Sequence, residues 1–406
     1  MRNSCPTESD NGLFSTQMLK SFSVENYRSF SRRQDLELRP LTLFFGWNSG
    51  GKSALLRFLP LVAESLRTGS SPIWLGGEVG RQATWPSLVS KATGRDALSF
   101  SLSWAEPQEF TAEWKIKGDL QGRWQEIESL VIDGEINDPS ARNWLGLLPE
   151  KKNGVPLPDG LTKVRDKLLE IRDQVQWIGG VRSRIPRATI SSGDAQPLIN
   201  SNGSDAVEHL VSAQLKSTAN PVLEATNSFF NKLNEQLILD NPADGIWRVV
   251  VQPTGSPHVR VDLCDTGEGY SQVLPVLVAL ARARTGGPKI LCLEQPELHL
   301  HTRAQAELAR QLITTVKSSN TPQILVETHS EVLLTSIQLA IAKGEIAPEL
   351  IRVYWIESLQ DGTSDAIPVD FNEKGQAENS TLSGAFAEAV QLGQDLITMQ
   401  LSAVKS

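Results

Sequence analysis

The stretch of sequence that decides the fold is Gly46-Trp47-Asn48-Ser49-Gly50-Gly51-Lys52-Ser53. It has the pattern G-x-x-x-x-G-K-S, with an apolar run at residues 41–45 before it and a run of helical periodicity at residues 54–62 after it. A buried strand, a glycine-rich turn and the start of a helix form the context that this pattern requires. The glycines let several backbone N–H groups converge on one anion. The stretch therefore predicts a phosphate-binding loop.

Two side chains at the end of this loop have defined roles in nucleotide sites. Lys52 can reach the β- and γ-phosphates, and the Ser53 hydroxyl can bind Mg²⁺. The alternative is an ordinary glycine turn that matches the pattern by chance. Because strand and helix patterns flank the loop on both sides, we favour a site for a nucleotide and Mg²⁺.

Composition places the chain among soluble proteins. It has 406 residues, 40% hydrophobic and 21% charged, which fits two or three domains or one large α/β unit with insertions. No apolar run reaches the roughly 18 residues of a membrane helix, and the first 17 residues lack the apolar core of a signal peptide. The three cysteines form no C-x-x-C pair, which favours a reducing compartment. We expect a cytoplasmic protein without a membrane partner.

The net charge of −8 argues against a broad nucleic-acid surface, since phosphate binding usually leaves a basic footprint. A local patch stays open as an alternative. Arg182, Arg184 and Arg187 form the densest basic cluster, and Lys151 and Lys152 form another. We favour an ion-paired or solvated surface for both, and keep DNA as an alternative partner.

The order of patterns predicts a mainly parallel sheet covered by helices. Residues 98–104 and 110–116 alternate as strands of a small antiparallel layer, whereas residues 118–163 are rich in turn residues. A helix from residue 221 is expected to include Leu237, followed by strands at 247–252 and 258–263. The last third alternates strands and helices, which is typical of a parallel sheet. Pro60 should kink or break the helix that follows the loop.

A second apolar run, residues 290–293, is followed by carboxylates. Glu294 comes first and suits the water shell of Mg²⁺. Gln295 would face the γ-phosphate, where it could orient water but could not take its proton. Glu297 could supply the missing carboxylate. The alternative is a strand that ends in exposed acids.

Two further motifs belong to the same set. His329 follows another apolar run, at residues 323–327, and we expect it to contact a γ-phosphate. Residues 265–272 open a helix with a G-x-G-x-S-Q pattern that can cradle an anion. His299 and His301 invite a transition-metal interpretation together with Glu297, but nothing adjacent in sequence completes such a site.

In this order, the motifs resemble those of ABC-type ATPase heads of the SMC, RecF and OLD group. Residues 22–30 resemble the "xNFRSF" start of such heads, and residues 177–182 resemble their "LGPLR" segment. Residues 294–301 resemble the "EEPExHLHP" block of OLD-like ATPases, and residues 327–330 resemble "xTHS". The resemblance covers residues 18–110 and 175–357. It implies an α/β fold of P-loop NTPase type, with a mainly parallel sheet, an antiparallel β layer and a helical lobe.

The resemblance also implies roles for individual residues. Ser53 and Glu294 would bind Mg²⁺. The residues implied in catalysis are Glu294, Gln295, Glu297 and His329. The residues implied in ATP binding are Gly46, Asn48, Ser49, Gly50, Gly51, Lys52, Ser53, Ala54, Gly267, Gly269, Ser271 and Gln272. Because Gln295 stands where many relatives have glutamate, ATP hydrolysis is expected to be slow unless Glu297 compensates. Gln82 is the candidate for the Q-loop glutamine.

The resemblance further implies domain boundaries. We expect a disordered tail at 1–17, the N-terminal part of the head at 18–110, a variable insertion at 111–175, the C-terminal part of the head at 176–370 and a helical extension at 371–406. The motifs of the head are present without a Toprim nuclease domain, a zinc-hook C-x-x-C or a long heptad arm. Any effector activity is therefore expected in another chain, encoded nearby.

The implied function is an ATPase switch. Two heads would pair head to tail through their ATP sites, as a homodimer or higher oligomer, with ATP held between one head's phosphate loop and the other's signature stretch. Such a switch would control a partner in anti-phage defence or DNA maintenance. The alternatives are a RecF-like DNA clamp in recombination and repair, and a transporter nucleotide-binding subunit, which the motifs at 22–30 and 294–301 disfavour.

Overall fold

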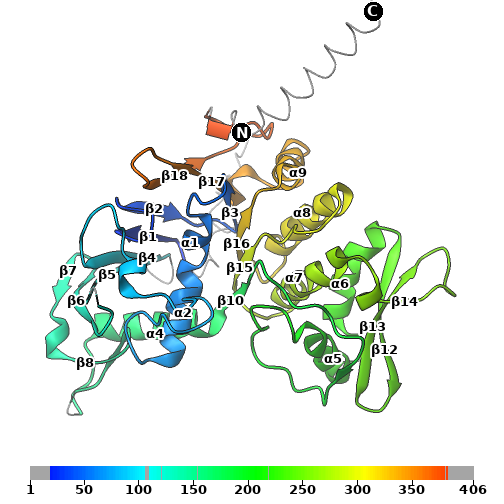
Figure 1. The fold of residues 1–406 in the computed structure, drawn as a ribbon, viewed down its shortest axis with the longest axis horizontal. Coiled ribbons are helices and arrows are strands. Elements are labelled where there is room, and N and C mark those ends of the chain that lie inside the picture. Colours follow the sequence, from blue (N-terminus) through cyan, green and yellow to red (C-terminus); the bar gives the residue numbers. More distant parts are fainter. Residues whose placement is uncertain are drawn as a thin grey trace, which may run out of the picture.

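The computed structural model describes residues 19–105, 109–119, 121–152, 154–217, 219–379 and 381–382 (Figure 1). The predicted tail at 1–17, and residues 383–406 of the predicted helical extension, lie outside the described residues. The domain boundaries as a whole stay a prediction.

A six-stranded sheet forms the centre of the molecule (Figure 1). Its strands, in spatial order, are β10 (Val175–Ile178), β15 (Ile290–Glu294), β16 (Gln323–Thr328), β3 (Leu41–Gly46), β17 (Ile351–Ser358) and β18 (Ser364–Val369). Every neighbouring pair is parallel except β17 and β18. This arrangement confirms the predicted mainly parallel sheet.

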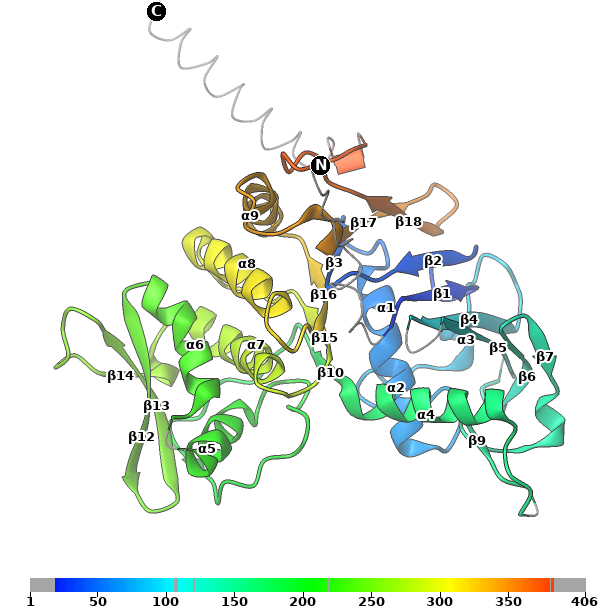
Figure 2. The ribbon, with the colours of Figure 1, turned by 180° about the vertical axis from the view of Figure 1, so that it is seen from behind.

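The sheet separates two hydrophobic cores, because successive side chains of a strand point to opposite faces. Leu43 and Val326 belong to the core under α7 (Glu268–Arg284), α8 (Thr302–Val316) and α9 (Glu331–Ala342). Phe44 and Leu325, their neighbours in sequence, belong to the core under α1 (Lys52–Leu56) and α2 (Phe58–Thr68). Figure 2 shows α7–α9 on one side of the sheet and α1 and α2 on the other. Burial on both faces explains why these strands read as continuous apolar runs.

The predicted helix after the phosphate loop is broken, as expected. Helix α1 ends at Leu56 and α2 begins at Phe58, with Arg57 between them. Pro60 has no N–H to donate to the carbonyl of Leu56, and its ring would clash with that carbonyl. The break therefore lies one turn before the proline.

An antiparallel sheet packs beside α1 and α2 and confirms the predicted β layer. Its strands, in spatial order, are β2 (Gln34–Glu37), β1 (Ser21–Glu25), β4 (Ala97–Trp104), β5 (Phe110–Gly118), β6 (Gln125–Ile132) and β7 (Glu135–Asn137). Residues 111–175 continue this lobe, since β5 and β6 pair with it and α4 packs against α2. The lobe also contains α3 (Trp85–Leu88), η1 (Pro139–Ala141), β8 (Asn143–Leu145), β9 (Leu148–Glu150) and α4 (Asp159–Gln174).

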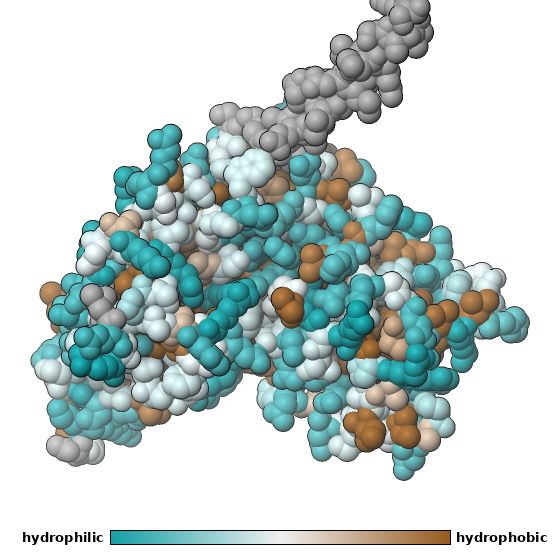
Figure 3. All heavy atoms as spheres, in the orientation of Figure 1, coloured by the Kyte–Doolittle hydropathy of each residue, from teal (hydrophilic) through white to brown (hydrophobic). Residues whose placement is uncertain are grey.

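A second lobe lies on the other side of the sheet. It contains β11 (Thr189–Ile190), α5 (Ala206–Lys216), α6 (Pro221–Lys232), β12 (Glu235–Ala243), β13 (Ile246–Pro253), β14 (Val261–Asp262) and η2 (Leu263–Asp265). The prediction that Leu237 continues a helix was wrong: Asn234 has a left-handed φ of 65°, and Leu237 then pairs with Val251 in the sheet. Of the predicted strand at 258–263, only Val261–Asp262 form a strand, β14. A notch separates the two lobes on one face (Figure 3).

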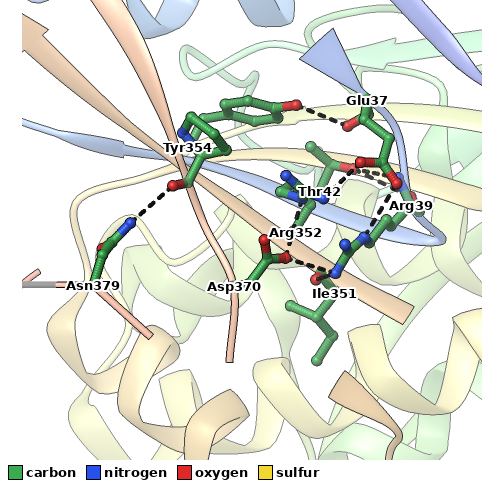
Figure 4. Close-up of polar contacts among 9 residues, drawn as sticks. Glu37, Arg39, Thr42, Ile351, Arg352, Tyr354, Asp370 and Asn379 are labelled. Atoms are coloured by element: carbon green, nitrogen blue, oxygen red, sulfur yellow. Dashed lines mark hydrogen bonds and ion pairs between the residues drawn. The ribbon is translucent and has the colours of Figure 1, made fainter. Parts of the chain in front are cut away.

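Charged side chains hold the amino-terminal edge of the sheet, away from the phosphate loop (Figure 4). Arg352 reaches Glu37 at 2.6 Å and Asp370 at 3.5 Å, and Arg39 reaches Asp370 at 2.9 Å. The Tyr354 hydroxyl donates to the Glu37 carbonyl at 3.1 Å. These bonds join β2, β17 and the segment after β18. The short helix η3 (Pro348–Leu350) leads into β17 at the same edge. Across the described part of the chain, no helix has the length and apolar character to cross a membrane.

Candidate nucleotide site

The phosphate loop follows β3 at the carboxyl edge of the sheet, where it requires glycine at two positions. Gly46 has a φ of 147°, and a Cβ there would lie 2.6 Å from the Ile356 carbonyl oxygen. Gly51 has a φ of 102°, and a Cβ there would lie 2.6 Å from the Ser29 hydroxyl. An L side chain at either position would force the loop off β17 or off the segment after β1.

Lys52 lies folded back onto its own loop. Its Nζ donates to the carbonyl oxygens of Gly46 at 3.0 Å and Trp47 at 2.5 Å. Burial lowers its pKa to about 8, and the nearby Glu327 carboxylate opposes this shift. Of the other predicted ATP-binding residues here, Asn48 and Ser49 are exposed, Gly50 is buried, and the Ala54 N–H donates to the Gly51 carbonyl.

Ser53 contacts a carboxylate that the sequence analysis did not assign. Its hydroxyl donates to Glu327 Oε1 at 2.7 Å, from the first turn of α1 to the end of β16. Glu327 is only 4% exposed, and its other oxygen has no hydrogen-bond partner. Burial raises its pKa, and the like charge of Glu294 adds to the shift. The signal for Glu327 in the sequence is a carboxylate at the end of an apolar run, two residues before His329.

Glu294, the predicted metal and catalytic residue, ends the neighbouring strand β15 and has a full set of partners. Arg57 donates to both of its oxygens, with Arg57 Nη2 lying 2.5 Å from Glu294 Oε2. Trp177 Nε1 donates to Oε1 at 2.7 Å, and the Gly180 N–H donates to Oε2 at 3.3 Å. Arg57 and Trp177 were not assigned to the site from sequence, because only the fold brings them to β15.

Gln295 and Glu297, both predicted to be catalytic, follow β15. The Gln295 N–H donates to the Glu327 carbonyl at 2.8 Å, and its backbone has a left-handed φ of 41°. Glu297 Oε1 accepts from the Thr328 hydroxyl at 2.6 Å and from the His329 N–H at 3.1 Å. Its other oxygen is buried without a partner, and burial raises its pKa. The structure therefore brings Glu297 to the end of β16.

His329 is half-buried directly after β16. Burial lowers the pKa of its imidazole, the Lys52 charge adds to the shift, and the Gly46 backbone opposes it. Lys52, Ser53, Glu294, Glu327 and His329 thus gather at one edge. Gln82, the candidate Q-loop residue, is exposed in a separate loop, and its role stays a prediction.

The predicted signature stretch opens α7, with Gly267 at its N-cap. Gly269 packs against the segment after β15, since a Cβ there would lie 2.6 Å from the His299 carbonyl oxygen. Ser271 and Gln272 are buried. Gly267 and Gly269 line a cavity of about 380 Å³ together with Leu233, Tyr270, His299, Leu300, His301, Arg303 and Ala304.

Arginines link the signature stretch to the β15 edge. Arg182 is buried and donates to the carbonyls of Glu294 at 3.2 Å and Gln295 at 2.9 Å, while Gln272 Nε2 donates to the Arg182 carbonyl at 3.1 Å. Arg184 pairs with Glu268 and Arg187 with Asp265. Two of the three arginines of this basic cluster are therefore ion-paired, whereas Arg182 is buried and bonds to backbone carbonyls.

The donor set fits Mg²⁺ better than a transition metal. Within the ranges described above, no group of three or more His, Cys, Asp and Glu side chains is placed to hold a metal ion. Mg²⁺ needs only one or two protein oxygens, with phosphates and waters completing its shell. The Ser53 hydroxyl and the unpartnered Glu327 oxygen meet that requirement.

Comparisons with known proteins agree with this geometry. A family model for the AAA ATPase domain matches residues 162–334, which include the signature stretch and the ends of β15 and β16. A solved Smc head bound to the C-winged helix domain of ScpA matches with a TM-score of 0.54 at 12% identity, over 87% of this chain and 98% of that chain. No curated protein matches the chain.

Two structures from Pyrococcus species give similar values. The Smc head of Pyrococcus furiosus, with an extended coiled coil and bound to the C-terminal domain of ScpA, has a TM-score of 0.50 at 12% identity, over 93% of this chain and 99% of that chain. The Smc head of Pyrococcus yayanosii, with a coiled coil and joint, has a TM-score of 0.50 at 10% identity, over 91% of this chain and 99% of that chain. At these identities the likeness concerns the fold.

Proposed function

Because the chain has the fold of an ABC-type ATPase head of the SMC and RecF group, we propose that it binds ATP with Mg²⁺ and pairs with a second copy as an ATP-controlled switch. The observation that carries this proposal is the placement of the phosphate loop. Lys52 and Ser53 lie at the carboxyl edge of the sheet, beside the carboxylates that end β15 and β16. Phosphate-binding folds use this edge for their nucleotide.

Each predicted residue takes one role in this proposal. Residues 46–54 hold the phosphates, with Lys52 leaving its own loop carbonyls to pair with them. His329 faces the terminal phosphate. Gln295 orients the attacking water, and Glu297 is the available proton acceptor. Since a glutamine cannot take a proton, the rate of hydrolysis depends on Glu297, and hydrolysis is slow unless this carboxylate compensates.

The signature stretch supports pairing between two chains. In its own chain, Gly269 packs against His299 and Gln272 bonds to Arg182, so these contacts fix the shape of the stretch. Gly267 is exposed at the start of a 17-residue helix. A second head can present its ATP to this exposed helix start, and ATP then holds the two heads together.

A partner protein completes the proposal. Two of the similar Smc heads were solved with a domain of ScpA bound, so heads of this fold can carry a second protein. We extend this to an effector encoded nearby, in anti-phage defence or DNA maintenance. The alternative, a DNA clamp, has less support because Arg184 and Arg187 are paired with acids and Arg182 is buried.

Substitution of Lys52 tests the first element of the proposal, the binding of ATP. We expect Lys52→Ala to weaken ATP binding at least about tenfold, because it removes a charge-assisted contact to phosphate. Equilibrium dialysis or calorimetry with ATP and Mg²⁺ measures this. Lys163→Ala, an exposed lysine on α4, is the matched control and should bind ATP like the wild type. A wild-type chain that binds no ATP, or a Lys52→Ala variant that binds it equally well, would refute the proposal.

A further inference from the structure

Strand order places Glu327 nearer to the phosphate loop than Glu294. Strand β16 lies directly beside β3, with Glu327 opposite Phe44, whereas β15 lies beyond β16, with Glu294 opposite Glu327. At about 4.8 Å between neighbouring strands, Glu327 is one spacing from the loop strand and Glu294 is two. The carboxylate closest to Ser53 is therefore on β16.

The two oxygens of Glu327 differ in their surroundings. Oε1 accepts the Ser53 hydroxyl at 2.7 Å, and Oε2 is buried without any hydrogen-bond partner. Buried carboxylate oxygens are normally satisfied, so an unsatisfied one marks a place for a cation or water. A serine hydroxyl has one proton and two lone pairs, so Ser53 can keep donating to Glu327 while a lone pair binds a metal ion.

Glu294 lacks such a free position. Arg57 takes both of its oxygens, and Trp177 and the Gly180 N–H add further donors. The side chains of Arg57 and Glu294 are 13% and 5% exposed, so this ion pair is largely removed from water. Arginine does not lose its charge in proteins. Direct metal binding by Glu294 would leave the Arg57 charge with fewer partners in a largely buried place.

We propose that Glu327, together with Ser53, provides the protein oxygens that face Mg²⁺ in this site. Glu294 keeps its bonds to Arg57 and Trp177 and positions the β15 edge around the ion. This inference rests on the proposed function, since it assigns ligands to the ion that accompanies ATP. It places the metal-facing carboxylate one strand closer to β3 than the sequence motif predicted.

The test uses Mn²⁺ as the probe, because this ion also prefers oxygen ligands. Electron paramagnetic resonance measures free Mn²⁺ during titration of the chain with a non-hydrolysable ATP analogue present. We expect Glu327→Gln to weaken Mn²⁺ binding at least about tenfold, as loss of a metal-facing group does. The control is Glu307→Gln, a buried glutamate on α8 that bonds to Gln311 and Arg310, and it should bind Mn²⁺ like the wild type.

The remaining variants separate the possible outcomes. Glu327→Asp keeps the charge and should recover part of the Mn²⁺ affinity. This variant carries the test if thermal melting shows that Glu327→Gln folds poorly. Weaker Mn²⁺ binding in Glu294→Gln, with Glu327→Gln unaffected, would overturn the inference and restore Glu294 as the metal-facing carboxylate. Failure of the wild type to bind the analogue at all would instead be a failure of the proposed function.

Discussion

At the scale of single residues, Lys52 is the side chain on which the proposed phosphate binding most depends. Its amine now donates to the Gly46 and Trp47 carbonyls, so it is held within the loop before any phosphate arrives. Its pKa is lowered to about 8 because burial disfavours the charged form. A phosphate beside the amine would favour the charged form and raise this pKa again.

The difference between the Lys52 pKa in the free chain and its pKa beside a phosphate predicts a pH dependence of ATP binding. Below a pH of about 7, Lys52 already carries its proton in the free chain; above about 8 it has lost the proton and must take one up to pair with phosphate. Affinity should therefore fall as pH rises above about 8, by up to about tenfold per pH unit. Calorimetry in buffers of different ionisation enthalpy measures the uptake directly. Unchanged affinity with no proton uptake at a pH of about 9 would contradict this role.

At the scale of elements, the phosphate loop depends on its contact with β17. A Cβ on Gly46 would meet the Ile356 carbonyl oxygen at 2.6 Å, and its φ of 147° is strained for any L side chain. We expect Gly46→Ala to lower the free energy of unfolding by about 1–3 kcal/mol, measured by urea titration. The control is Gly50→Ala, whose nearest neighbours would lie at 3.4 Å, and it should change stability little. Equal effects of the two substitutions would mean that the β17 contact does not constrain the loop.

Local patterns predicted most of these elements because each has a strong period or a buried run. The strands that reach the site lie close to their predicted places, α7–α9 fall in the predicted alternation of strands and helices, and Pro60 correctly marked a break. The strands between residues 118 and 163 were missed because their polar, turn-rich composition carries little periodicity, although β6 pairs with β5 across a short turn. Strand β12 was missed because Leu237 was assigned to the preceding helix, although β12 pairs with β13, the next strand in sequence.

The candidate site could be predicted only where its residues belong to a motif. The phosphate loop was visible from its glycines and lysine, and the β15 and β16 ends from apolar runs that stop at polar residues. Arg57, Trp177 and Arg182 join the site through strand order and packing, which no local pattern reports. The contact between Ser53 and Glu327 spans 274 residues of sequence, so only the β3–β16 pairing could reveal it.

At the scale of the whole molecule, the proposed switch requires two chains for each complete site. The phosphate loop and the signature stretch are held by different neighbours: β17 contacts the loop, whereas Arg182 and the segment after β15 contact the signature. Gly267 offers a way to block pairing alone. It has an ordinary φ of −59°, and a Cβ there meets nothing within 4 Å, so Gly267→Asp should fold and should bind ATP.

The most direct test of the ATP-controlled pairing is the molar mass by light scattering, with and without a non-hydrolysable ATP analogue and Mg²⁺. For the wild type we expect the analogue to raise the mass from the 44.5 kDa of one chain to twice that value. Lys52→Ala and Gly267→Asp should each remain at the mass of one chain, because one lacks the phosphate contact and the other brings a carboxylate toward the partner's phosphates. A wild-type mass that does not change when the nucleotide site is saturated would contradict the account.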